Sequence, residues 1–367
     1  MRYQRVDTGG EKMKKINYRE LGIFFALIIL WIVLFATNKV FRAPHIYTSI
    51  LREASFSGIC GIGMTFCIAS KHFDQSVASM NALLACSFTL ILPGMAASLG
   101  VFGILLAMII IVVLSIIFGI LNGVFVAKLK IPAFIATLGT LYVFRSFAII
   151  VSEGQPTIIN QIVSSEQNKL FRYIGMGNVR IPFTQIETPI PFAFVVMVIC
   201  GIIGTVILRK TSLGRHILAI GNSVEASRIS GINIDRTKIL VFALVGLFVG
   251  VGTILNTSFL GSSNPGMNME FEFVVITATV LGGTALAGGK GSIFTTIVAA
   301  IFVVTVSAGM NAFRMDSFTQ RIVMGVILLF AFSINEIRAM IERERVKAKA
   351  RKEAAQQVIE PLSQEGA

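Results

Sequence analysis

The chain has 367 residues, of which 54% are hydrophobic and only 14% are charged. Soluble domains carry roughly 25% charged residues, so this composition excludes an ordinary soluble domain and indicates an integral membrane protein. The formal net charge of +13 would suit a nucleic-acid-binding protein. However, the basic residues cluster beside apolar runs, which is the positive-inside pattern of membrane proteins, and we expect no nucleic acid among the partners.

The apolar runs predict an all-α polytopic membrane protein with about ten transmembrane or half-membrane helices, since about 20 apolar residues cross a bilayer. The first run, 21–37, has no small-residue cleavage site after it and is expected to stay uncleaved. Residues 1–20 then form an N-terminal segment, 21–337 the transmembrane domain and 338–367 a charged tail. In chain order the predicted segments are 21–37, 51–70, 74–94, 97–124, 132–151, 190–208, 239–260, 272–286, 292–311 and 318–337.

The placement of lysine and arginine predicts the orientation of these segments, because short basic loops stay on the cytoplasmic side. The N-terminal segment, the turn at Lys128 and Lys130, the loop 209–238 and the tail are all basic. Ten crossings put all four on one side, so both termini are expected in the cytoplasm and the chain in the plasma (inner) membrane. The long connection 152–189 is charge-balanced and is expected outside.

The basic loop 209–238 also carries signals for a short helix outside the bilayer. We predict Asn222 as its N-cap, Glu225 as the capping-box partner three residues on, and Gly231 as the residue that ends it. One interpretation is a helix that docks on a cytoplasmic partner. The other is an ordinary loop with a helical turn, and the local pattern leaves both open.

Two polar or glycine-rich stretches, 71–76 and 282–292, interrupt the apolar pattern in opposite halves of the chain. Such paired breaks are typical of interrupted helices along a transport path, and an ionisable residue such as Asp74 at membrane depth is a functional candidate. The alternative is that both are turns between neighbouring spans. Candidates for a translocation path are Asp74, Ser76, Asn81, Gly282, Gly283, Thr284, Gly288 and Gly289.

No catalytic or cofactor-binding pattern accompanies these features. The stretch around Gly289-Lys290 differs from a phosphate-binding loop twice, at Thr284 and at Gly291, where the pattern requires glycine and Ser or Thr. The four cysteines lie within apolar runs without metal-binding spacing. We therefore expect a transport protein with no ATPase site, no metal and no cofactor of its own. An ion-coupled transporter would need acidic or basic relays inside several spans. An intramembrane enzyme would need convergent Ser/His, Asp/Asp or His/Glu sets on facing spans.

Several stretches resemble the membrane permease subunit of ribose-type ABC sugar importers. They are 211–239 (TSLGRHILAIGNSVEASRISGINIDRTKI), 280–292 (VLGGTALAGGKGS), 130–145 (KIPAFIATLGTLYVFR) and 73–79 (FDQSVAS). The resemblance extends from about residue 50 to 335. It implies a permease for a monosaccharide or similar small polar solute, driven by ATP that a partner hydrolyses. A branched-chain amino acid or nucleoside permease is the alternative.

The resemblance also implies partners and a coupling site. The partners are a cytoplasmic ATP-binding subunit, an extracytoplasmic solute-binding protein and a second permease copy or paralogue, all within or beside a lipid bilayer. The family's coupling signature, Glu-Ala-Ala followed by a glycine, is similar to Glu225-Ala226-Ser227 with Gly231 here, which implies a coupling site at Asn222, Glu225, Ala226, Arg228 and Gly231. The family's Gly-Gly-Ile-Asp-Leu-Ser run differs, because here it is 71–76, Lys-His-Phe-Asp-Gln-Ser, followed by Ala78 in place of a glycine.

Overall fold

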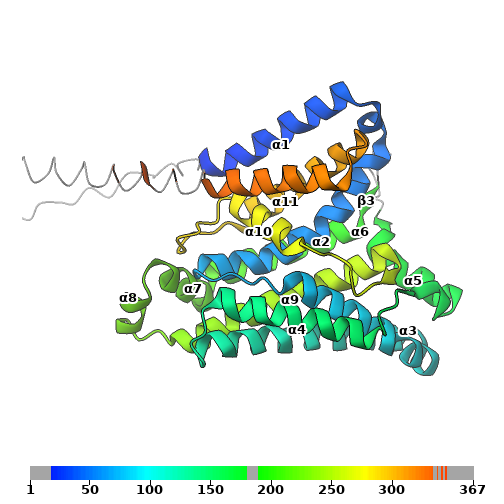
Figure 1. Cartoon of the computed structure of the whole chain (residues 1–367), viewed down its shortest axis with the longest axis horizontal. Coiled ribbons are helices and arrows are strands. Elements are labelled where there is room, and N and C mark those ends of the chain that lie inside the picture. Colours follow the sequence, from blue (N-terminus) through cyan, green and yellow to red (C-terminus); the bar gives the residue numbers. More distant parts are fainter. Residues whose placement is uncertain (1–17, 180–188, 334–336, 338–339, 342–343, 345–367) are drawn as a thin grey trace, which may run out of the picture.

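The computed structural model describes residues 18–179 and 189–333, with four further positions at 337, 340, 341 and 344 (Figure 1). Most of the predicted N-terminal segment, part of the connection 152–189 and most of the tail lie outside these residues. The ten predicted segments correspond to α1 (Tyr18–Thr37), α2 (Pro44–Ala69), α3 (Val77–Ala127), α4 (Ala133–Val151), α6 (Phe192–Lys210), α9 (Ile234–Leu260), α10 (Phe271–Leu281), α11 (Ile293–Ala312) and a helix at Ser317–Ser333. A 3-10 turn, η1 (Lys39–Arg42), joins α1 to α2.

The all-α polytopic architecture is thereby confirmed. Within the described residues, α3, α4, α6, α9 and α11 are long and apolar enough to cross a membrane. Helix α3 covers two predicted segments, because Gly100 takes non-helical angles (φ 57°, ψ −132°) and divides it into arms 77–99 and 101–127. Helix α10 has only 11 residues. At 1.5 Å per residue it reaches about half of the roughly 30 Å hydrocarbon thickness, so it is a half-membrane helix.

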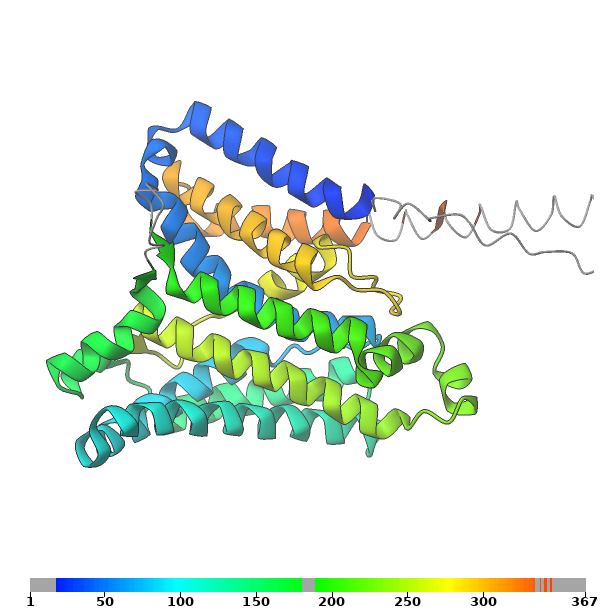
Figure 2. The ribbon, with the colours of Figure 1, turned by 180° about the vertical axis from the view of Figure 1, so that it is seen from behind.

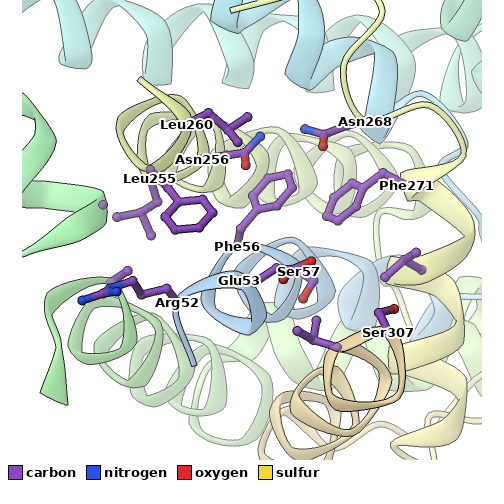
Figure 3. Close-up of a pocket in the computed structure, with 15 residues that line it drawn as sticks. Arg52, Glu53, Phe56, Ser57, Leu255, Asn256, Leu260, Asn268, Phe271 and Ser307 are labelled. Atoms are coloured by element: carbon purple, nitrogen blue, oxygen red, sulfur yellow. The ribbon is translucent and has the colours of Figure 1, made fainter. Parts of the chain in front are cut away.

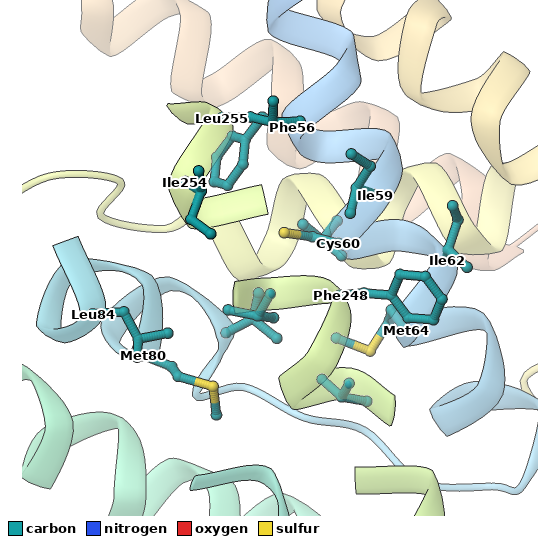
Figure 4. Close-up of a cluster of buried hydrophobic side chains, with 14 of the residues drawn as sticks. Phe56, Ile59, Cys60, Ile62, Met64, Met80, Leu84, Phe248, Ile254 and Leu255 are labelled. Atoms are coloured by element: carbon teal, nitrogen blue, oxygen red, sulfur yellow. The ribbon is translucent and has the colours of Figure 1, made fainter. Parts of the chain in front are cut away.

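Helix α2 is the centre of the molecule. Every residue from Ala54 to Ala69 is buried, so this part of the helix has no face left for lipid. Figure 4 shows Phe56, Ile59 and Met64 of α2 among side chains from α3 and α9. Helices that are apolar on all sides belong in the interior of a bundle, and the absence of a polar face in 54–69 explains the position of α2.

The second arm of α3 packs closely against α9 through two facing GxxxG motifs, Gly119–Gly123 and Gly246–Gly250. A Cβ atom on Gly119 would collide with the backbone of Phe242, and one on Gly246 would collide with the backbone of Ser115. Small residues at four-residue spacing let helix backbones approach in membrane bundles. These motifs therefore fix α3 against α9.

The two ends of the bundle are built differently (Figures 1 and 2). One end carries β1 (Thr157–Ile158), η2 (Ile159–Gln161), α5 (Ser165–Met176) and β2 (Asn178–Val179). β1 pairs antiparallel with β4 (Ser262–Ser263), and β2 pairs antiparallel with β3 (Ile190–Pro191). The other end carries α7 (Ser212–Asn222) and α8 (Val224–Ile229). The connection 152–189 is thus partly folded, because Ser164 and Gln167 form a capping box that starts α5.

Candidate functional site

The basic loop 209–238 contains two helices, of which only α8 was predicted. The predicted cap is wrong by one residue: Asn222 ends α7, and the N-cap of α8 is Ser223, whose hydroxyl accepts a hydrogen bond from the Ala226 N–H. Asn222 and Glu225 therefore form no capping box. Serine and asparagine are about equally favourable residues at the N-cap position of a helix. The extension of α7 to Asn222 decides between them, and the local sequence does not show that extension.

The end of α8 agrees with the prediction for Gly231. This glycine has φ +79°, and its N–H bonds to the Arg228 carbonyl while the Ile232 N–H bonds to the Ser227 carbonyl. That pair of bonds is the Schellman motif, which needs a left-handed residue and so favours glycine. An isolated helix of six residues is unstable in water. Its serine cap and its glycine stop hold α8 in place.

Helix α8 presents an exposed surface at the end of the bundle. Glu225, Ala226 and Arg228 are exposed, and Ile229 is 81% exposed. Glu225 and Arg228 form an ion pair of 3.5 Å, whose two side chains are largely in solvent, so it contributes little to stability. Ser227 alone is buried and anchors the helix. Single exposed apolar side chains are common on protein surfaces, so the docking role of α8 stays a prediction.

The two interrupted stretches meet the α7–α8 junction, and we call this meeting point the junction contact. It comprises Ala69, Gly221, Asn222, Gly288 and Gly289. The Gly289 N–H donates to the Ala69 carbonyl at 2.8 Å, which ties the segment between α10 and α11 to the end of α2. A Cβ on Gly288 would approach the Gly221 backbone to less than 3 Å, and one on Gly289 would collide with the Asn222 side chain.

Lys71, in the other interrupted stretch, also reaches the junction contact, because its Nζ donates to the Asn222 carbonyl at 3.5 Å. Gly282 and Gly283 follow α10, where Gly282 lies against the backbone at Thr296 and Gly283 has φ +88°. Thr284 is fully buried. The glycine-rich stretch therefore lies at the same end of the bundle as α7 and α8.

Asp74 lies in a buried hydrogen-bonded cluster at the start of α3. Its Oδ1 accepts from both the N–H and the hydroxyl of Ser76, at 2.8 and 2.6 Å. Asn122 donates from the second arm of α3 to the Ser76 hydroxyl at 2.9 Å and to Asp74 Oδ2 at 3.4 Å. A carboxylate at a helix N-terminus is favoured by the helix dipole. The cluster fastens the two arms of α3 together at that level.

Asn81 connects the first arm of α3 to α9 and to the segment before α10. Its amide donates to the Thr253 hydroxyl at 2.8 Å, and its carbonyl oxygen accepts from the Asn268 amide at 2.7 Å. Arg145 of α4 holds the same segment by donating to the carbonyls of Pro265 and Met267. Together these bonds fix the chain between α9 and α10.

A cavity of about 220 Å³ lies between α2, α9, α10 and α11, near the end that carries α5 (Figure 3). The rings of Phe56 and Phe271 stack in its wall, with centroids 4.3 Å apart and planes 10° apart. Polar side chains share the lining with these rings. They are Arg52, Glu53, Ser57, Asn256, Asn268 and Ser307.

Two buried donor atoms of this lining make no hydrogen bond within the described chain. They are Nδ2 of Asn256 and Nε of Arg52. Asn256 is only 7% exposed. Arg52 does donate from Nη2 to Asn178 at 2.7 Å. Buried polar groups in native proteins are paired almost everywhere, so an unpaired amide in a cavity wall indicates a place for a polar molecule.

The predicted path residues and this cavity do not coincide. None of the eight residues, all of them described, lines the cavity, although Asn81 bonds to Asn268, which does. Their role in transport stays a prediction. Sequence reasoning missed Arg52 and Glu53, which stand inside the first half of an otherwise apolar helix. Ionisable residues in an apolar span were the signal that could have found them.

Comparison with known proteins identifies the family. Residues 46–332 match the family described as branched-chain amino acid transport system / permease component. The chain belongs to this family of transport permeases. It is a multi-pass membrane protein, as its apolar helices indicate. No solved structure matches the chain significantly.

Curated relatives cover nearly the whole chain. The ribose import permease protein of Bacillus subtilis is 34% identical, over 87% of this chain and 95% of its own length. The L-arabinose transport system permease protein of Escherichia coli is 33% identical, over 92% and 98%. The xylose transport system permease protein of Haemophilus influenzae is 30% identical, over 88% and 98%.

Proposed function

We propose that this chain is the membrane permease subunit of an ABC importer that translocates a monosaccharide with energy from ATP hydrolysed by a partner subunit. The observation that carries this proposal is the set of relatives. Permeases for ribose, L-arabinose and xylose match this chain at 30–34% identity across almost their full lengths. All three substrates are pentoses, so the cargo is a monosaccharide of that size.

The structure supports a conformational mechanism. The cavity lies near one end of the bundle and the junction contact lies at the other. The same helices reach both. Helix α2 carries Arg52 at the cavity and Ala69 at the junction contact, while α10 and α11 line the cavity and flank the glycine-rich stretch. A displacement of α8 would pass through the junction contact into three walls of the cavity. Alternating access needs such a connection.

The proposal assigns the partners to the two ends of the bundle. A cytoplasmic ATP-binding subunit docks on α8 through Glu225, Ala226, Arg228 and the exposed Ile229, while Asn222 and Gly231 shape the chain beside that helix. This assignment places both termini in the cytoplasm, as the basic segments favour. An extracytoplasmic solute-binding protein meets the end that carries α5. A second permease copy or paralogue completes the pathway in the bilayer, and ATP is bound by the partner subunit.

A branched-chain amino acid is the second candidate, because the family description names that substrate. One feature of the cavity favours it: Arg52 and Glu53 bring opposite charges to the same wall, as the carboxylate and ammonium groups of an amino acid require. The sugar specificity of the similar permeases favours the monosaccharide over this candidate.

Reconstitution tests both candidates. The chain is placed in proteoliposomes with a candidate ATP-binding subunit and a candidate solute-binding protein. Uptake of labelled D-ribose, D-xylose, L-arabinose and L-leucine is measured with ATP or a non-hydrolysable analogue. We expect uptake of at least one pentose with ATP only, and none of leucine. Uptake of leucine without any pentose would replace the first proposal by the second, and uptake with the analogue would exclude an ATP-driven importer.

A further inference from the structure

The cavity beside Phe56 and Phe271 is large enough for a solute rather than for a single structural water. Its volume is about 220 Å³, whereas a water molecule occupies about 30 Å³. Pockets for drug-sized ligands measure about 300–1,000 Å³, so this cavity suits a smaller molecule of about ten non-hydrogen atoms. All of the residues that line it belong to a single chain (Figure 3).

The lining specifies the chemistry of the occupant. Asn256 Nδ2 and Arg52 Nε are buried donors without a partner in the described chain, so they call for acceptor oxygens. The carboxylate of Glu53 is an acceptor in the same wall and suits hydroxyl donors. A molecule with several hydroxyl groups offers both donors and acceptors, so a polyhydroxylated ligand meets these needs.

The aromatic side of the cavity supplies the complementary surface. Phe56 of α2 and Phe271 of α10 stack face to face, and each ring keeps one apolar face that the other ring does not cover. A sugar ring has hydroxyl groups at its edge and C–H groups on its faces, so one sugar face can lie on such a ring face while the edge bonds to Asn256. A simple ion would leave the ring face unused, and a hydrocarbon chain would leave the polar atoms unpaired.

We propose that this cavity is a monosaccharide-binding site within the single chain, and that Asn256 is its specificity-determining donor. The inference rests on the proposed function and adds where the sugar binds and which side chains recognise it. Phe271 supplies the stacking face and Asn256 the directed hydrogen bond. Because the site lies on α2, α9, α10 and α11, occupancy is sensed by the helices that reach the junction contact.

Direct binding tests the site. The full chain is purified in detergent, and binding of the labelled pentose that the reconstituted importer transports is measured by equilibrium dialysis. Asn256→Leu, which keeps the size of the side chain, and Phe271→Leu should each raise Kd about 2- to 10-fold. Thr257→Val is the matched control, because Thr257 is the adjacent buried residue and its hydroxyl is also unpaired, but it does not line the cavity. It should leave Kd unchanged.

Transport selectivity provides a second measurement, because a general packing defect would not change the preference among sugars. Asn256→Asp replaces the donor by an acceptor without changing shape, and it should alter the ratio of KM values among D-ribose, D-xylose and L-arabinose. If the importer transports pentose, and the Asn256 variants change neither Kd nor this ratio of KM values, the binding-site inference is refuted and the proposed function stands. If the wild-type importer takes up no pentose, both the proposed function and the inference that rests on it are refuted.

Discussion

The tightest test of the coupling proposal is Gly221→Ala, which adds one methyl group to the junction contact. A Cβ atom there would lie closer than 3.0 Å to the Ala69 carbonyl oxygen and to the Gly289 nitrogen, distances that real Cβ atoms do not show. Both neighbours are backbone atoms, so they cannot move aside by changing a rotamer. The Gly289 to Ala69 hydrogen bond of 2.8 Å must therefore lengthen or break.

The expected cost follows from these contacts. Inserting a methyl group into a packed site costs about 1–3 kcal/mol, and the lost hydrogen bond contributes about 0.5–1.5 kcal/mol. The better helix propensity of alanine offsets about 0.5–1 kcal/mol of this cost. The midpoints of these ranges leave a net loss of about 2 kcal/mol, and a loss of that size at a contact proposed to couple two sites corresponds to roughly a 30-fold loss of coupling.

The assay separates coupling from folding. In proteoliposomes with the partner subunits, stimulation of ATP hydrolysis by the loaded solute-binding protein should fall at least about fivefold, while basal hydrolysis persists. Gly139→Ala in α4 is the control, because a Cβ there meets nothing within 4 Å. Gly221→Ala that inserts normally and retains full stimulation and uptake would show that the junction contact does not transmit the movement.

Three further predictions address the remaining parts of the site. Ser223→Ala should destabilise α8 by about 0.5–2 kcal/mol and reduce ATPase assembly, whereas Asn222→Ala leaves the cap intact; co-purification of the partner subunit measures both, and equal effects would contradict the capping assignment. Asp74→Asn removes the charge that holds the Ser76 cluster, and uptake by the full system should fall; unchanged uptake would show that Asp74 has no such role. In a chain without its native cysteines, an impermeant thiol reagent on intact cells should label Ser165→Cys and not Ser230→Cys, and the reverse pattern would invert the orientation.

The periodic features of the fold could be predicted from the sequence. Each of the ten predicted apolar segments corresponds to a helix or to one arm of α3 in the described residues, because in a bilayer each helix satisfies its own backbone and length alone sets the span. Gly231 was also predictable, since ending a helix with a left-handed residue is a local matter. The one-residue error at Asn222 arose because both candidate caps, Asn222 and Ser223, satisfy the same local rule.

The cavity and the junction contact could not be predicted in this way. They depend on which helix faces meet, and that is decided by close packing between segments far apart in the chain. Gly119 and Gly246 are examples, because their close backbone contacts exist only when α3 and α9 are placed together. In the sequence, Asn256 is likewise only a polar residue in an apolar helix. It becomes part of a cavity lining only when the side chains of α2 and α10 are placed around it.

In the junction contact, the glycines of the stretch 282–292 serve for close backbone approach within the chain. Phosphate-binding loops also use glycines for close backbone approach, but here Gly288 and Gly289 approach Gly221 and Asn222 of the same chain. Glycines on both sides of a contact bring two backbones together without flexible side chains between them. Such a contact can move as a rigid unit, whereas one through long side chains would absorb the displacement. The proposed transmission of a movement from α8 to α2 and α11 requires this stiffness.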